Sequence, residues 1–195
     1  MIFGENIYNM INQNLIYIVL LNVVISLLIS YIIWKKDSKW TNAIKIKMNT
    51  KEVLKIIGIS ILIDIVLTII LNVSDVENRF PSYENVMLFL TNSNIFVLII
   101  CTGILTPIVE EIIFRGIIFN RLKEYNIGLQ VSIIIQAVIF GIIHFNIVQS
   151  TYAMIIGIFF AVIYEKKKTI VAPIIAHMTF NLFAIALVFL TTLNP

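Results

Sequence analysis

The sequence predicts an all-α fold, a polytopic transmembrane helical bundle of about six spanning helices. Apolar residues make up 59% of the 195 positions and charged residues only 13%, about half the charged share of a soluble domain. The apolar residues also gather into runs close to the roughly 20 residues that a spanning helix needs. Such a chain cannot cover itself with a polar surface, so lipid must face much of it.

Six runs qualify as spanning segments. The first contains no charge, and the second is interrupted by Lys55 and Asp64. The third contains Glu110, Glu111 and Arg115. The fifth is the shortest and would need polar neighbours or local thinning of the bilayer to span. The predicted spans are residues 15–34, 53–73, 95–119, 127–148, 151–164 and 169–192.

The charges in the gaps between these runs predict the topology. The gap after the first span holds six lysines, whereas the next gap holds only Arg79 against three acidic residues. The later gaps continue this alternation, and one missed or false helix would break it. By the positive-inside rule the basic gaps are cytoplasmic, which predicts that both termini lie outside the cytoplasm. The Ile-, Asn- and Lys-rich composition favours a bacterial source and hence the bacterial cell membrane.

Several classes of protein are excluded by the same composition. A nucleic-acid-binding protein needs a basic face on a folded surface, and here the basic residues lie in short gaps. Cys101 is the only cysteine, so it forms no internal disulfide and is predicted to pack in its apolar run. Residues 1–14 carry Glu5 and no Lys or Arg, unlike a signal peptide. No internal repeat divides the chain, so we expect one domain over residues 1–195.

Three polar clusters lie inside the predicted spans. A charge at mid-bilayer costs about 2.5–3.5 kcal/mol even on the lenient insertion scale. Such residues are therefore expected to face the bundle interior or water. The clusters are Glu110-Glu111-Ile-Ile-Phe-Arg115, Phe140-Gly-Ile-Ile-His144 and His177-Met-Thr-Phe-Asn181.

Helical spacing predicts the partners in the first cluster. Glu111 and Arg115 lie four residues apart, so they share a face and can form an ion pair; a structural role is favoured for them. Glu110 is rotated by about 100° from Glu111 and has no local counter-ion. Glu110 is therefore the candidate proton acceptor.

The two histidines complete the predicted site. His144 is alone on its predicted helix, while His177 and Asn181 share a helix face. Glu110 could take a proton from a water that His144 helps to hold, and His177 and Asn181 could donate to the developing oxyanion. The same Glu110, His144 and His177 could instead hold a divalent metal such as zinc. This metal alternative is weaker, because the spacing does not resemble H-E-x-x-H.

In their order and spacing, the motifs E-E-x-x-x-R, F-x-x-x-H and H-x-x-x-N resemble those of the CPBP intramembrane proteases. This is the CAAX-protease and bacteriocin-processing (Abi) family, to which the Ras-converting CAAX endopeptidase belongs. The resemblance covers the motif-bearing half of the chain, about residues 95–192. It implies a helical membrane bundle with an endopeptidase site, and a peptide or protein substrate at the membrane, prenylated if the CAAX likeness extends to the substrate.

The resemblance also implies the role of each motif residue. Glu110 matches the water-activating carboxylate, His144 the first histidine, and His177 and Asn181 the groups assigned to the oxyanion. The supporting residues of the first motif match Glu111 and Arg115. The family is often labelled as metalloproteases, and a metal-free glutamate mechanism has also been argued, so the cofactor stays open.

Two other functions stay open on the residues alone. A non-catalytic membrane scaffold or bacteriocin-immunity protein would bind a partner, and its effect would survive Glu110→Gln. A transporter or proton pathway could also use intramembrane carboxylates and histidines, but no repeated half supports it. Outside the motifs, Asp64 is expected to make an interior hydrogen bond, and Gly141 and Gly157 to allow close helix approach.

Overall fold

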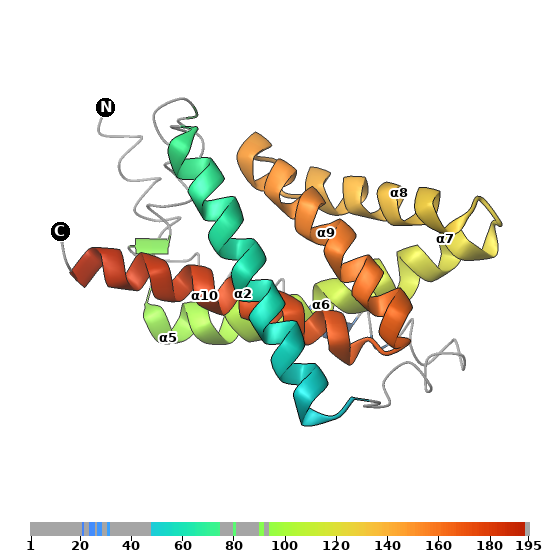
Figure 1. Cartoon of the computed structure of the whole chain (residues 1–195), viewed down its shortest axis with the longest axis horizontal. Coiled ribbons are helices and arrows are strands. Elements are labelled where there is room, and N and C mark those ends of the chain that lie inside the picture. Colours follow the sequence, from blue (N-terminus) through green and yellow to red (C-terminus); the bar gives the residue numbers. More distant parts are fainter. Residues whose placement is uncertain are drawn as a thin grey trace.

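The computed structural model describes residues 48–74, 80, 90–91 and 94–193, together with six positions between 21 and 31. These residues form helices joined by short turns, with no strand among them (Figure 1). Four of the described helices are long and apolar enough to cross a membrane. The predicted all-α membrane bundle is confirmed, although most of the predicted first span, residues 15–34, lies outside the described residues. The four helices cover Thr50–Val73, Ile95–Glu124, Ile147–Lys167 and Val171–Leu190.

Helix α2 (Thr50–Val73) begins at a capping box. The backbone N–H of Glu52 donates to the Asn49 side chain at 3.0 Å, and the backbone N–H of Asn49 donates to the Glu52 carboxylate at 3.1 Å. These two bonds satisfy groups that a helix start leaves open. Further along α2, Asp64 is buried and accepts a hydrogen bond from the Tyr152 hydroxyl of α9. The predicted interior hydrogen bond of Asp64 is confirmed, and it ties α2 to the bundle.

The third span is one continuous helical segment that enters a π-helical hydrogen-bond register twice. Two π-helical stretches alternate with α-helical ones, and π-bulges are frequent at functional sites. Pro107, which has no N–H to donate, stands two residues into the second α-helical stretch. The segments are α5 (Ile95–Val97), η2 (Leu98–Leu105), α6 (Thr106–Glu111), η3 (Ile112–Phe119) and α7 (Asn120–Glu124).

Helices α8 (Leu129–Ile142) and α9 (Ile147–Lys167) form a hairpin with a tight turn between them. The predicted fourth span, residues 127–148, is wrong at its C-terminal end, because α8 has only 14 residues and is about 21 Å long. The predicted fifth span, residues 151–164, is too short, because α9 has 21 residues. The physical reason is Asn146, whose side chain accepts hydrogen bonds from two backbone N–H groups and starts α9 inside an apolar run.

Two glycines allow α8 and α9 to pack closely. A Cβ atom added at Gly141 would lie 2.6 Å from the carbonyl oxygen of Ser150, and one added at Gly157 would lie 3.1 Å from Cδ1 of Phe140. Both contacts are closer than ordinary van der Waals packing permits. The predicted close approach at both glycines is therefore confirmed.

Helix α10 (Val171–Leu193) crosses α2 and runs beside the α5–α6 segment (Figure 1). Buried aromatic rings fill the space between these helices and the α8–α9 hairpin, among them Phe114, Phe140, Phe160 and Phe180. This aromatic core surrounds the polar clusters of the three motifs.

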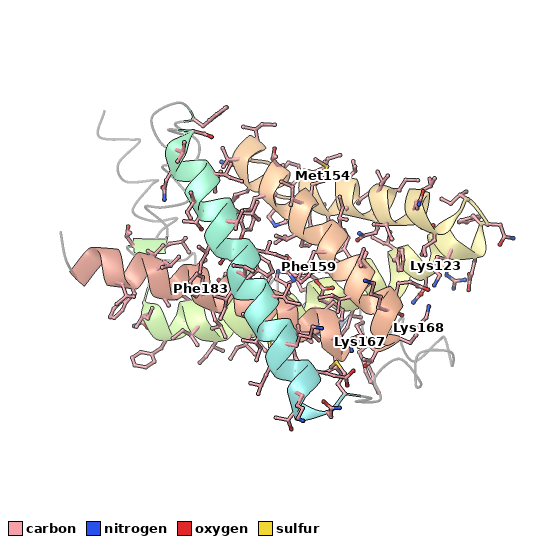
Figure 2. The ribbon with its side chains drawn as sticks, viewed as in Figure 1. Lys123, Met154, Phe159, Lys167, Lys168 and Phe183 are labelled. Carbon is pink, nitrogen blue, oxygen red and sulfur yellow. The ribbon has the colours of Figure 1, made fainter. Side chains whose placement is uncertain are left out.

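Basic side chains gather at one end of the bundle (Figure 2). Lys123 of α7 forms an ion pair with Glu165 of α9 at 2.6 Å, and Lys167 of α9 forms one with Glu52 of α2 at 2.5 Å. These contacts join three helices at the end that the charge pattern predicts to be cytoplasmic.

Candidate active site

The predicted ion pair between Glu111 and Arg115 is confirmed. Arg115 Nη1 lies 2.9 Å from Glu111 Oε1, and both side chains are 0% exposed. Arg115 Nη2 also donates to the Gly157 carbonyl at 3.1 Å. The guanidinium carbon lies 4.6 Å from the ring centroid of Phe140 and 5.1 Å from that of Phe160. Arg115 is thus held by a carboxylate, a carbonyl and two aromatic rings, and it compensates the buried charge of Glu111.

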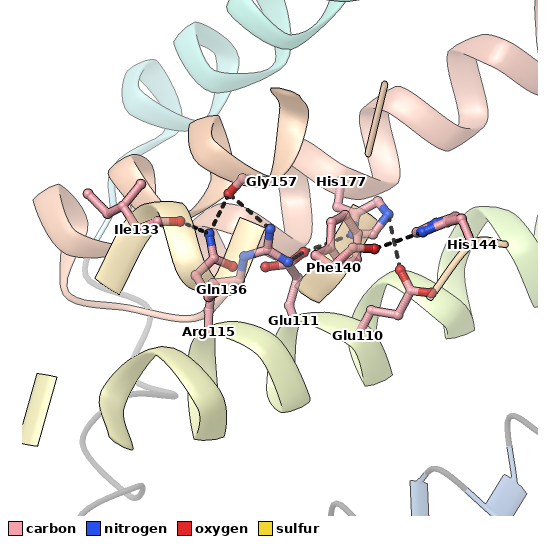
Figure 3. A network of polar contacts seen from close by, with 9 residues as sticks. All are labelled: Glu110, Glu111, Arg115, Ile133, Gln136, Phe140, His144, Gly157 and His177. Atoms are coloured by element: carbon pink, nitrogen blue, oxygen red, sulfur yellow. Dashed lines mark hydrogen bonds and ion pairs between the residues drawn. The ribbon is translucent and has the colours of Figure 1, made fainter. Parts of the chain in front are cut away.

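Helical spacing did not reveal that Glu111 also contacts His177. His177 Nδ1 lies 2.8 Å from Glu111 Oε1, and its ring stacks on Phe160 with a centroid separation of 4.8 Å. An ionised carboxylate only accepts hydrogen bonds, so the proton of this contact belongs to Nδ1. The other ring nitrogen, Nε2, is therefore the one that faces the remaining carboxylate, Glu110 (Figure 3).

Glu110 is the more open of the two adjacent carboxylates. Its side chain is 20% exposed, and Oε2 lies 3.6 Å from Nε2 of His177. That separation is longer than a direct hydrogen bond, so His177 does not hydrogen-bond directly to this oxygen. Glu110 is therefore free to meet a small molecule, whereas Oε1 of Glu111 already contacts both Arg115 and His177.

The structure places His144 in the turn after α8, not inside a helix as its predicted span required. Its Nδ1 donates to the Phe140 carbonyl at 2.8 Å, and its ring packs on the edge of the Phe140 ring. With the Nδ1 proton committed to a carbonyl, Nε2 carries the lone pair of the neutral ring. Figure 3 shows His144, Glu110 and His177 gathered at one end of the polar network.

Asn181 lies one turn beyond His177 on α10, and its side chain contacts a different backbone group. Its Nδ2 donates to the Thr102 carbonyl at 2.8 Å. Thr106, at the end of η2, donates to the carbonyl of Cys101, five residues back, and the next donor in this register would be Pro107, which has none. Asn181 therefore satisfies the carbonyl that the π-helical register leaves open.

One residue of the network, Gln136, was missed by the sequence analysis. It is fully buried on α8, and its amide donates at 3.0 Å to the carbonyls of both Gly157 and Ile133. The Gly157 carbonyl thus accepts hydrogen bonds from Gln136 and from Arg115. Gln136 lies four residues before Phe140 on the same helix face, and this spacing inside an apolar run was the signal that could have identified it.

The metal alternative concerns the same side chains. Within the described part of the chain, no group of three His, Cys, Asp or Glu side chains is placed to share a metal ion. The predicted ligands Glu110, His144 and His177 have donor atoms that suit such an ion.

Fold and site together define a helical membrane protein with a buried Glu–Arg–His network that presents a further carboxylate. Residues 92–183 match the family described as Type II CAAX prenyl endopeptidase Rce1-like. The Bacillus subtilis (strain 168) protein named Putative membrane peptidase YdiL is 40% identical over 88 residues, which cover 45% of this chain and 36% of that protein. No solved structure matches the chain. The predicted relationship to the CAAX proteases is therefore confirmed over residues 92–183, which are similar to the Rce1-like family.

Proposed function

We propose that the chain is a membrane endopeptidase that hydrolyses a peptide bond in a membrane-associated peptide or protein. The observation that carries the proposal is the arrangement of Glu111, His177 and Glu110. Glu111 fixes the imidazole through Nδ1, and Nε2 then faces the open carboxylate of Glu110. The match to the Rce1-like family and the name of the Bacillus relative support the same activity.

In the proposed reaction, Glu110 removes a proton from a water molecule as the water oxygen attacks the peptide carbonyl carbon. Nε2 of His144 accepts the second hydrogen of this water and holds it in position. The carbonyl π electrons move to oxygen and give a tetrahedral oxyanion. Glu110 then passes its proton to the leaving nitrogen, the C–N bond breaks, and the carbonyl re-forms.

The oxyanion needs donors, and we assign this role to His177 and Asn181. His177 can donate from Nε2 when both of its ring nitrogens carry protons. The Asn181 amide has two N–H groups; one donates to the Thr102 carbonyl, and the proposal gives the other to the oxyanion. Arg115 and Gln136 act on this site only through the residues that they hold.

The substrate class is also a proposal. The description of the matching family names a CAAX prenyl endopeptidase, so the first peptides to test carry a C-terminal CAAX sequence with and without a prenyl group. A library of unmodified membrane peptides covers the alternative that the chain matures other peptides.

The experiment is cleavage of these peptides by the purified protein in detergent, beside Glu110→Gln and the surface control Glu124→Gln. Products from the native chain and the control, but not from Glu110→Gln, would support the proposal. Equal products from all three would remove Glu110 from the mechanism. The same assay after treatment with a chelator should show unchanged cleavage, while a loss that added zinc restores would favour the metal alternative.

A further inference from the structure

Phe145 stands in a backbone conformation that a bulky side chain rarely adopts. It directly follows His144 in the turn after α8, and its N–H donates to the Ile142 carbonyl at 3.2 Å. Its φ is 51°, in the left-handed region. Helices usually place glycine at this position, because a Cβ atom is unfavourable there. The side chain of Phe145 is nevertheless 93% exposed, so contacts within the chain do not explain the aromatic ring.

The turn that carries Phe145 is well fixed on both sides. On the α8 side, Nδ1 of His144 donates to the Phe140 carbonyl. On the α9 side, the Asn146 side chain accepts from the backbone N–H groups of Val148 and Gln149. Strained backbone persists where the surroundings fix it, and it clusters at active sites. This turn packs the His144 ring against the Phe140 ring and leaves the Phe145 ring exposed.

The neighbours of Phe145 extend its apolar surface. Ile142, Ile143 and Ile147 are all exposed around the same turn. We call these three residues and Phe145 the apolar rim. It borders the candidate site along the chain, because Phe145 directly follows His144 and their Cα atoms are about 3.8 Å apart. A peptide whose scissile bond reaches the water that the proposed mechanism assigns to His144 would lie close to this rim.

We propose that Phe145 determines substrate specificity, by contacting an apolar side chain of the peptide within two residues of the cut. The inference rests on the proposed function and names the kind of residue that the site accepts. A polar side chain placed against the rim would lose its hydrogen bonds to water without gaining new ones. An apolar one would exchange water or loose lipid contacts for packing against the ring.

A role for Phe145 in lipid contact alone predicts a different result. If the ring only contacts lipid at the tip of the hairpin, its loss changes the cleavage of every peptide by the same factor. If the ring contacts the substrate, its loss changes the ratio between peptides. The test therefore compares peptides that differ only at the positions beside the cut, with leucine, alanine or serine there.

The variants are Phe145→Gly, which removes the ring, and Phe145→Leu, which keeps an apolar side chain. For the native protein we expect kcat/KM to favour the leucine peptide over the serine peptide by about tenfold or more. Phe145→Gly should reduce this ratio to below about threefold, and Phe145→Leu should keep most of it. Because glycine relieves the left-handed strain, Phe145→Gly should also raise the Tm by about 2–4 °C.

Two matched controls separate the effects. Asn126→Gly changes another left-handed residue, at φ 55°, in the turn between α7 and α8. It should raise the Tm without changing the ratio between peptides. Phe96→Ala removes an exposed phenylalanine of α5 and should leave the ratio unchanged.

Two results would overturn the inference. An unchanged ratio in Phe145→Gly, or an equal loss for every peptide, would show that the ring does not contact the substrate beside the cut. A native protein that cleaves none of the peptides would remove the proposed function, and this inference with it. Cleavage by the native protein with an unaltered ratio in the variant would remove this inference alone.

Discussion

Glu111 Oε1 lies 2.8 Å from Nδ1 of His177, a residue 66 positions away in the sequence. The same oxygen accepts a hydrogen bond from Arg115 at 2.9 Å. The contact decides which face of the imidazole is available, because a ring that donates from Nδ1 must use Nε2 for any chemistry. In the proposed mechanism, the second glutamate of the first motif is therefore a positioning residue, and the first glutamate is the one that meets the substrate.

The contact predicts the behaviour of Glu111→Gln. Glutamine keeps the size of the side chain, but it loses the charge and can turn its NH₂ group toward Nδ1, which favours the wrong tautomer of His177. We expect kcat to fall by about 10²–10⁴-fold with little change in KM. Steady-state kinetics on a cleaved peptide would measure this. A kcat equal to that of the native protein would show that His177 needs no orientation by Glu111.

Arg115→Leu should strongly destabilise the protein. It leaves the Glu111 carboxylate buried without its cation and removes one of the two donors to the Gly157 carbonyl, so we expect a loss of about 3–5 kcal/mol in the free energy of unfolding. Denaturant titration in detergent would measure it. Adding Glu111→Gln should cost less than the sum of the two single changes, because the residues are coupled. Additive losses would contradict the pairing.

Gly157→Ala tests the close approach of α8 and α9 at the site. The new Cβ would lie 3.1 Å from Phe140 Cδ1 and 3.4 Å from Arg115 Nη2. We expect a loss of about 1–3 kcal/mol in the free energy of unfolding. The matched control is Gly58→Ala on α2, where a Cβ would meet nothing within 4 Å and helix propensity predicts a gain of up to about 1 kcal/mol. Equal effects of the two changes would contradict the packing described here.

Asn181→Leu distinguishes the structural contact of Asn181 with Thr102 from its proposed role at the oxyanion. Without the amide, the Thr102 carbonyl loses its donor, and we expect a loss of about 1–3 kcal/mol in the free energy of unfolding. If the second N–H also stabilises the oxyanion, kcat should fall by about 10²-fold or more. Thermal unfolding and cleavage of the same preparation give both quantities. A variant as stable as the native protein would show that the contact with Thr102 contributes nothing.

Local spacing predicted the part of this site that lies on one helix. The pair of Glu111 and Arg115 follows from four-residue spacing, and a buried Asp64 in an apolar helix had to find a hydrogen-bond partner. The contact between Glu111 and His177 could not be predicted in this way. It depends on how α6 and α10 pack, and no local pattern records that packing.

The position of His144 was hidden for a different reason. The turn between α8 and α9 lies inside a continuous apolar run, so hydropathy gives no sign of a break. The usual glycine signal of a helix end is also missing, because Phe145 takes the left-handed position. Only Asn146, as the N-cap of α9, marks the turn in the sequence. The register change near Pro107 was similarly not predicted, since a proline alone does not specify a π-helical stretch.

The most direct test of the account is the rate of the chemical step in Glu110→Gln, measured in a single turnover with excess enzyme on one cleaved peptide. Size-exclusion profiles and Tm values would establish that variant and native protein are equally folded. We predict a decrease of about 10²–10⁴-fold in the rate of peptide-bond hydrolysis, with peptide binding retained. A folded Glu110→Gln protein that cleaves at the native rate would contradict the assignment of Glu110 as the group that activates water.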